Sequence, residues 1–346
     1  MALAPYPWLE DAAAALNAIR SQLPNAILLY GAPGTGLYEL ADAFAKSLFC
    51  EHPAPDGTPC GRCGACALTA AGTHPDYRQV LSEYMCSVHD VPYAAADNER
   101  SEKKTLSREI RIHQIRALED FVGLNANQGG KRIIVIYPAD MIRAEAAAAL
   151  LKSMEEPPEG LTYILAAEDI DAVLPTIRSR SRLLRVRMPT RAEGEAFLKS
   201  RRVKDPEAAL AMAGSSPLAA LSKSADERLS AKTEAALTAL LRRGAALTAD
   251  EVVRGYANDL TIPAFSLQLS RWTHDLIRIK SGLAPRYFVN ESAALSQIAG
   301  RASLKALFGF EAEAKSVRRS SDHPLNAKQV WEAALLRYQQ AARPVK

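Results

Sequence analysis

The chain has 346 residues, of which 48% are hydrophobic and 24% are charged, and its formal net charge at pH 7 is +4. This length predicts two or three globular domains with ample core. The sequence contains no apolar run of about eighteen residues and no cleavable leader, which argues against membrane insertion and export, so we expect a cytoplasmic protein without a membrane partner. The charge is spread over both signs and gives only a weak indication of nucleic acid binding.

Helices and strands alternate in the hydrophobic pattern of roughly the first 188 residues. The predicted helices are 11–23, 37–48, 66–71, 107–121 and 144–156. The predicted strands are 27–30, 78–81, 133–137, 162–167 and 183–186. This alternation predicts an α/β domain with a mostly parallel sheet and helices on both faces.

The strand signal ends after Pro189, and every periodic segment beyond it is helical. One of these helices carries an apolar stripe that is expected to face a core: Leu269, Trp272, Leu276 and Ile279. We predict three domains, namely an α/β domain at 1–188, a small helical domain at 189–225 and a larger all-α domain at 226–346.

Segment 82–107 differs from the rest of the α/β domain. It is polar, mixed in charge and without a period, so we predict an exposed insertion there. Cys86 lies within it and is expected to be a free thiol.

A glycine-rich turn joins the first predicted strand to the next helix, in the order of a phosphate-binding P-loop. In the pattern G-x-x-x-x-G-K-[ST], Gly31 and Gly36 occupy the glycine positions, with Gly34 between them. The lysine position holds Leu37 and the hydroxyl position holds Tyr38. Lysine reaches the terminal phosphates and the hydroxyl binds magnesium. We therefore interpret the P-loop as degenerate and expect no productive ATP binding.

Four of the five cysteines lie within seventeen consecutive residues, with the spacing C-x9-C-x2-C-x2-C. They are Cys50, Cys60, Cys63 and Cys66. Four thiolates can complete a tetrahedral shell around Zn²⁺ at about 2.3 Å, and two-residue spacers let neighbouring sulfurs reach one ion. No coordination position remains for water, so the predicted zinc site is structural and not hydrolytic.

The alternative for this cluster is a set of unrelated reduced thiols, and the close spacing favours the metal. His52 and His74 could compete as ligands, but four cysteines already fill the shell. The odd number of cysteines suits a reducing compartment better than a disulfide framework. We predict a zinc-binding module at about 50–66, inserted in the α/β domain.

Short motifs follow one another along the chain in a specific order. They are Pro7-Trp8-Leu9, the loop 31–38, the four cysteines, His74-Pro75-Asp76-Tyr77, Leu150-Leu151-Lys152-Ser153-Met154-Glu155-Glu156-Pro157-Pro158, Thr176-Ile177-Arg178-Ser179-Arg180-Ser181 and His323-Pro324-Leu325-Asn326. Together they resemble the delta prime subunits of the bacterial DNA polymerase III clamp loader. This resemblance implies an AAA+ type module made of the α/β domain and a small lid at 189–225, followed by a helical collar at 226–346.

The resemblance also implies a function and a set of partners. Subunits of this family sit in a hetero-pentamer with ATP-hydrolysing gamma/tau subunits and a clamp-opening delta subunit. The assembly loads the sliding clamp onto primed DNA during replication. The chain would then be part of the DNA-directed DNA polymerase III holoenzyme, a nucleotidyltransferase complex, and would not be an enzyme on its own.

Other nucleotide-handling positions also differ from those of ATP-hydrolysing relatives. Tyr137-Pro138 stands where an Asp-Glu pair would bind magnesium and activate water, and neither residue can do so. Ala167 stands at the polar sensor position, and Leu218 stands where a lid arginine is expected. These separate losses agree with the degenerate P-loop.

Arg180 lies in Ser179-Arg180-Ser181, which matches the Ser-Arg-Cys motif of the family except for its last residue. The resemblance implies that Arg180 is an arginine finger, donated in trans to the ATP of a neighbouring subunit. A planar guanidinium can bond two phosphate oxygens and offset charge in the transition state. The alternative is a solvated basic edge, because several arginines crowd the same segment.

Two other functions stay open at this point. One is an active AAA+ ATPase of the gamma/tau type, which would bind Mg·ATP tightly as an isolated chain. The other is a zinc-containing regulator that binds DNA by itself, with a steep salt dependence.

Overall fold

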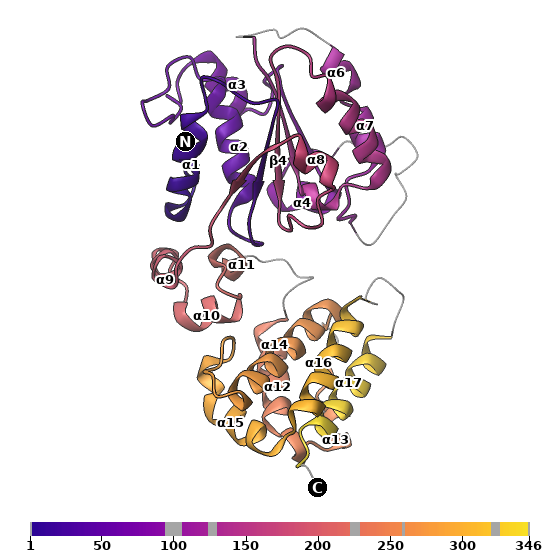
Figure 1. Ribbon diagram of the computed structural model, residues 1–346. Coiled ribbons are helices and arrows are strands. Elements are labelled where there is room, and N and C mark those ends of the chain that lie inside the picture. Colours follow the sequence, from indigo (N-terminus) through magenta and orange to yellow (C-terminus); the bar gives the residue numbers. More distant parts are fainter. Residues whose placement is uncertain are drawn as a thin grey trace. The chain divides into compact units, whose positions relative to one another are not determined.

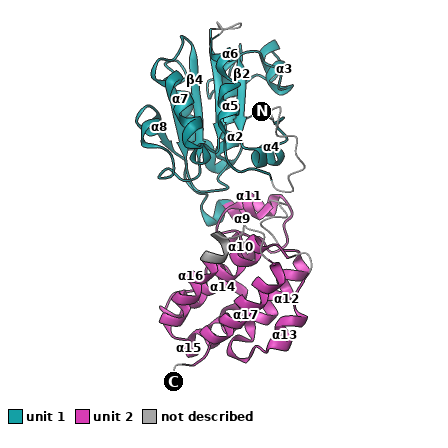
Figure 2. Cartoon of the chain, turned by 90° about the vertical axis from the view of Figure 1, so that its right-hand side faces the viewer, with its two compact units in different colours: residues 1–193 teal, residues 194–346 magenta. Residues whose placement is uncertain are grey.

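The computed structural model describes residues 2–93, 106–123, 130–221, 229–257, 260–319 and 326–344. The chain divides into two compact units, Met1–Glu193 and Gly194–Lys346 (Figure 2). The first unit is built on a sheet, and the second consists of helices in the part that the structure describes.

Five parallel strands form the sheet of the first unit, in the order β2-β3-β4-β1-β5. They are β1 (Ala26–Tyr30), β2 (Tyr77–Leu81), β3 (Arg132–Tyr137), β4 (Leu161–Ala167) and β5 (Arg182–Arg185). Every residue of β3 and β4 is buried, as expected of apolar strands that are covered on both faces. The prediction of a parallel α/β sheet is confirmed. Because β3, β4 and β1 are parallel neighbours, the loops that follow these strands start at the same edge of the sheet.

Helices cover both faces of the sheet (Figure 1). One face is covered by α2 (Leu37–Leu48), against which α1 (Glu10–Ala18) and α3 (Gly64–Ala70) pack. Buried side chains from the other face pack against α5 (Ile112–Arg116), α6 (Glu119–Gly123), α7 (Ala144–Glu155) and α8 (Pro175–Ser179). Two 3₁₀ turns complete the unit, Pro7–Leu9 and Ala139–Met141.

The helix predicted at 107–121 is wrong, because two short helices replace it. The backbone at Ile110 forms a parallel bridge with Ile142, and its N–H donates to the carbonyl of Met141 at 2.9 Å. This extended pairing delays the first helix until Ile112.

Segment 82–107 contains a helix that its polar sequence did not predict, α4 (Glu83–His89). The Ser82 hydroxyl caps it by accepting the Met85 N–H at 3.3 Å, and Cys86, within the helix, is buried. A local cap and one anchoring side chain are enough to start a helix here. Residues 94–105 of the predicted insertion lie outside the described residues.

Nine α-helices and two 3₁₀ turns, Gly244–Ala246 and Val289–Glu291, are described from Arg191 onward, and no strand is found among the described residues there. A small core of Leu198, Leu210 and Ala220 joins α9 (Arg191–Ser200), α10 (Pro206–Met212) and α11 (Pro217–Leu221). The remaining helices are α12 (Ala231–Arg242), α13 (Ala249–Arg254), α14 (Ile262–Lys280), α15 (Ser292–Arg301), α16 (Leu304–Arg319) and α17 (Ala327–Ala341). The prediction of a helical C-terminal part is confirmed.

Helices α12 to α17 share one large core around Trp272, Trp331 and Tyr338. The Trp272 Nε1–H donates to the Tyr338 hydroxyl at 2.9 Å, and that hydroxyl donates to the carbonyl of Leu241 at 2.7 Å. The predicted stripe on α14 is therefore core, because Trp272 is fully buried and its polar atom is satisfied. None of the helices in the described ranges is long and apolar enough to cross a bilayer.

Candidate functional site

The loop between β1 and α2 keeps the backbone of a tight glycine turn. Gly36 has φ of 91° and Gly34 has φ of 70°, a region that favours glycine. A Cβ on Gly36 would lie 2.8 Å from the Tyr6 ring, and a Cβ on Gly31 would lie 2.6 Å from the Val186 carbonyl oxygen. The predicted glycine positions are thus required by the local geometry.

Residues near the N-terminus pack directly on this turn. The Trp8 Nε1–H donates to the carbonyl of Thr35 at 2.8 Å, and the Tyr6 and Trp8 rings stack with centroids 5.0 Å apart. The Tyr6 ring lies against Gly36. Aromatic side chains thus contact the backbone of the turn, and one of them donates a hydrogen bond to a carbonyl in it.

The two residues that replace the lysine and the hydroxyl of the P-loop pattern are both buried. Leu37 packs in the core at 3% exposure, and Tyr38 is 7% exposed. The Tyr38 ring centroid lies 4.1 Å from that of His89 and 5.8 Å from that of Tyr137. We call Tyr38, His89 and Tyr137 the aromatic cluster.

The aromatic cluster joins the two positions at which active relatives are expected to hold magnesium. Tyr38 stands at the hydroxyl position of the loop, and Tyr137 stands at the first position of the acidic pair. The Tyr38 hydroxyl accepts from Gln79 Nε2 at 2.8 Å, and the Tyr137 hydroxyl donates to Glu168 Oε1 at 2.7 Å. Rings therefore occupy this part of the sheet edge, and both phenols have partners.

Burial keeps the aromatic cluster uncharged. It raises the pKa of Tyr38 and of Tyr137 well above the ordinary value of a phenol, and it lowers the pKa of His89 to about 4. At neutral pH the two phenols are protonated and the imidazole is neutral. The cluster thus offers no carboxylate and no cation with which to bind Mg·ATP.

Restoring the P-loop pattern in the double variant Leu37→Lys with Tyr38→Thr is expected to destabilise the chain and not to create an ATP site. Removing the ring leaves a cavity beside His89 and Tyr137, and such large-to-small changes cost about 3 to 5 kcal/mol. Chemical denaturation measures the loss, and calorimetric titration with Mg·ATP tests binding. The control Tyr38→Phe keeps the ring and should stay near wild-type stability. Micromolar Mg·ATP binding by the double variant would contradict this prediction.

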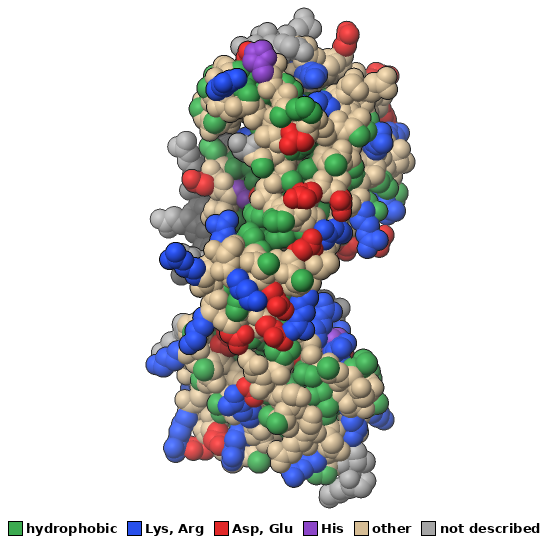
Figure 3. All heavy atoms as spheres, turned by 90° about the vertical axis from the view of Figure 1, so that its left-hand side faces the viewer, with side chains coloured by type: hydrophobic (Ala, Val, Ile, Leu, Met, Phe, Trp, Pro, Cys, Tyr) green, Lys and Arg blue, Asp and Glu red, His purple; other side chains and the backbone are tan. Residues whose placement is uncertain are grey.

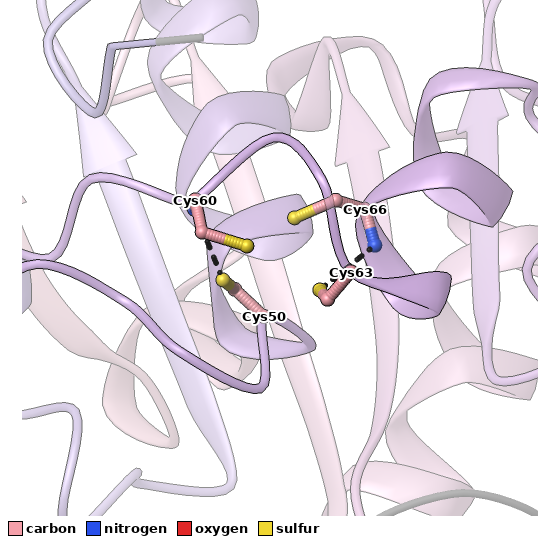
Figure 4. Close-up of side chains that lie close together, drawn as sticks. All are labelled: Cys50, Cys60, Cys63 and Cys66. Carbon is pink, nitrogen blue, oxygen red and sulfur yellow. Dashed lines mark hydrogen bonds between the residues drawn. The ribbon is translucent and has the colours of Figure 1, made fainter.

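The four cysteines predicted to bind zinc come together in the structure (Figure 4). Cys50 follows α2, Cys60 and Cys63 lie in the next loop, and Cys66 lies in α3. Their Sγ atoms all lie within 4.8 Å of one another. Tetrahedral bonds of about 2.3 Å place ligand sulfurs roughly 3.8 Å apart, so four cysteines in this arrangement could hold a metal ion.

Backbone N–H groups point at these sulfurs, as in structural zinc loops. The Cys60 N–H donates to Cys50 Sγ at 3.1 Å, and the Cys66 N–H donates to Cys63 Sγ at 3.5 Å. Hydrogen bonds from the N–H groups of Arg62 and Cys63 lower the pKa of Cys60 to about 6. Burial raises the pKa of Cys66 to about 12, and a dication beside it would favour its thiolate.

The other candidate ligands are engaged elsewhere or lie outside the group. His74 is buried, its ring centroid lies 4.1 Å from that of Phe49, and its Nδ1 accepts from the Asp76 N–H at 3.2 Å. Within the described ranges, the group of sulfurs includes neither His52 nor Cys86. Cys86 is a free, buried thiol.

Two residues near the N-terminus, one in α1 and one just after it, bond to the cysteine loop, and no sequence motif indicated them. Arg20 Nη1 donates to the carbonyl of Ser47 at 2.8 Å, and its Nη2 donates to the carbonyl of Gly57 at 2.9 Å. Asn17 Nδ2 donates to the carbonyl of Pro55 at 3.0 Å. Arg20 also donates to Ser47 Oγ and to Asn17 Oδ1, but the bonds to the cysteine loop itself end on backbone carbonyls, which no motif of side chains marks.

Arg180 lies at the C-terminal end of α8, and its side chain is 37% exposed. Its Nη2 lies 2.6 Å from Glu155 Oε1, and its Nη1 donates to the carbonyl of Thr176 at 3.2 Å. Of the two remaining predicted positions, Ala167 is buried at the end of β4 and Leu218 lies in α11 of the second unit. The structure thus places the predicted arginine at the surface.

The surface carries both charge signs. On the face drawn in Figure 3, lysine and arginine side chains lie next to aspartate and glutamate side chains. In the first unit, Arg187 pairs with Glu193 at 2.7 Å and Arg178 pairs with Asp171 at 3.6 Å. These pairs reduce the basic character of the segment around Arg180.

The family model described as "DNA polymerase III, delta subunit" matches residues 13–190, slightly more than half of the chain. The chain belongs to this family. The match falls within the first unit, which holds the glycine loop, the four cysteines and Arg180. The resemblance drawn from the motifs is thereby confirmed.

Individual relatives are named as delta' subunits of DNA polymerase III. DNA polymerase III subunit delta' of Pseudomonas aeruginosa is 36% identical over 219 residues, which cover 62% of this chain and 60% of that protein. The Escherichia coli K12 protein of the same name is 32% identical over 224 residues, with the same two shares. The chain thus matches about 60% of the length of these relatives. A gamma subunit-related DNA polymerase III protein from Thermotoga maritima has a solved structure that covers 96% of this chain and 99% of its own, at 16% identity and a TM-score of 0.48.

Proposed function

We propose that the chain is a delta prime subunit of the DNA polymerase III clamp loader that does not hydrolyse ATP. The observation that carries this proposal is the contact between Tyr38 and Tyr137, because it fills with aromatic rings the two positions that would bind magnesium. The chain would act as a subunit of the holoenzyme and not as an enzyme by itself. Family membership supports the clamp-loader role.

The proposed architecture follows the family. Residues 1–188 would form the AAA+ type domain, with the zinc module inserted at about 50–66. Residues 189–225 would form the lid and 226–346 the collar that holds the subunit in a hetero-pentamer. The small core of α9, α10 and α11 is separate from the large core of α12 to α17, which supports a division of the helical part. The partners would be the gamma/tau ATPase and the delta subunit, and the ring would act on the sliding clamp and primed DNA in the cytoplasm.

The zinc ion would be structural. Four thiolates leave no open coordination position, so the ion cannot activate water. Bound zinc would supply a cross-link between the end of α2, the cysteine loop and α3. Arg20 and Asn17 bond to backbone carbonyls of the same loop.

Arg180 would act on ATP bound to a neighbouring subunit. Its exposure at the end of α8 supports this role, since an arginine finger must lie at the surface of its own subunit to reach a phosphate bound by a neighbour. The guanidinium would bond γ-phosphate oxygens and offset the charge that develops during transfer. A subunit without a site of its own could thus still take part in hydrolysis.

The test combines two measurements on the purified full chain. The chain is expected to co-purify with the gamma/tau and delta subunits in a stoichiometric complex, and equilibrium titration of the isolated chain with Mg·ATP should give no binding. Tight Mg·ATP binding would instead favour the active ATPase. Binding of DNA by the chain alone, weakening steeply with salt, without assembly into a complex, would favour the zinc-containing regulator.

A further inference from the structure

The Arg180 side chain is held between two helices. Its Nη2 donates to Glu155 Oε1 at 2.6 Å, across from α8 to the last residue of α7. Its Nη1 donates to the carbonyl of Thr176 at 3.2 Å and to Ser179 Oγ at 3.5 Å. The Arg180 N–H also donates to the carbonyl of Ile177 at 3.2 Å, so backbone and side chain are both fixed.

The ion pair between Arg180 and Glu155 contributes little to the stability of the fold. The two side chains are 37% and 52% exposed, and ion pairs in such surroundings contribute little to the free energy of folding. Holding a long arginine side chain in one geometry also costs rotamer entropy, which offsets part of that contribution. The principal effect of Glu155 is therefore on the orientation of the guanidinium.

The arrangement leaves part of the guanidinium available. An arginine side chain carries five N–H donors. Within the described residues, three of them donate, to the Thr176 carbonyl, Ser179 Oγ and Glu155 Oε1. Two donors remain for an anion from outside the chain. The Arg180 side chain is thus already restricted to one rotamer, so binding an anion costs less conformational entropy than it would for a free side chain.

We propose that Glu155 is a positioning residue that presents Arg180 to the terminal phosphate of a neighbouring subunit's ATP. This inference rests on the arginine-finger role proposed above. Glu155 bonds Arg180 and does not touch the nucleotide. Without it the guanidinium samples other rotamers, and small displacements of a catalytic group lower the rate steeply.

The experiment uses the reconstituted clamp loader in which every ATPase site except the one next to this chain is inactivated. DNA-stimulated ATP hydrolysis is measured for the wild type, Glu155→Gln, Arg180→Ala and the double variant. We expect Glu155→Gln to lower kcat about tenfold with little change in KM, since the group it orients acts in the transition state. In the Arg180→Ala background the same change should have no further effect.

The matched control is Glu156→Gln, which removes the same charge from the next, also exposed, residue. It should leave kcat unchanged, and melting temperature and complex assembly should be unchanged for both glutamine variants. A wild-type kcat in Glu155→Gln, or an equal loss in Glu156→Gln, would overturn the positioning role while leaving the finger intact. If Arg180→Ala itself has no effect, the finger role fails as well.

Discussion

Replacing Arg180 by alanine is expected to lower ATP hydrolysis at the neighbouring site by roughly 10³-fold, at the lower end of the range for arginine fingers. The guanidinium would otherwise offset charge on the transferring phosphoryl group, and alanine offers no donor there. ATP affinity at that site should change much less, because the interaction strengthens in the transition state. Single-turnover hydrolysis in the reconstituted loader measures this effect when the other ATPase sites are inactivated.

The control for this experiment is Arg182→Ala. Arg182 is exposed and lies two residues further on, in the edge strand β5, so its loss removes the same charge from the same surface. Both variants keep the backbone hydrogen bonds of the segment. Equal rates for Arg180→Ala and the wild type would refute the finger, and equal losses in both variants would point to the general basic character of the segment.

Removing the metal is expected to destabilise the folded chain substantially. We expect the protein, purified under reducing conditions, to contain one zinc ion, and Cys66→Ser to abolish it. A ligand present at about a thousand times its dissociation constant stabilises the folded state by roughly 4 kcal/mol. For a unit of this size, that corresponds to a fall in Tm of about 10 °C. Metal analysis and thermal melting with and without a chelator measure both quantities.

Cys86→Ser is the matched control for the metal prediction. Cys86 is buried, lies outside the group of four sulfurs and has the carbonyl of Leu81 3.8 Å from its thiol. Serine there should keep the zinc ion. Zinc-free wild-type protein with an unchanged Tm in chelator would rule out a structural zinc site.

The sheet could be predicted from the sequence because its signal is local. Strands such as β3 and β4 are continuous apolar runs, and each prediction lies within one residue of the observed bounds. The prediction of one helix at 107–121 failed because the structure there depends on a contact between segments that are distant in sequence. Pairing of Ile110 with Ile142 is a contact between distant segments, and periodicity within a short window contains no information about it.

The candidate site likewise has a part that local sequence predicts and a part that it does not. The four cysteines are close in sequence, so their spacing alone predicted the cluster that the structure brings together. The aromatic cluster could not be predicted, because Tyr38, His89 and Tyr137 are separated by about fifty residues each and meet only when α2, α4 and β3 assemble. The sequence predicted which chemical groups are missing from the loop, and the structure shows which side chains lie at those positions.

The aromatic cluster also has a consequence for how such a chain can evolve. Each of its three rings packs against the other two, so a change at one position leaves a cavity that the remaining two cannot close. A route back to a phosphate-binding loop would need new residues at Leu37, Tyr38 and Tyr137 together, and every single step on it would produce a less stable protein. The packing around Tyr38 therefore acts as a barrier to reversal, which holds the loop to its present form even where no selection acts on the loop itself.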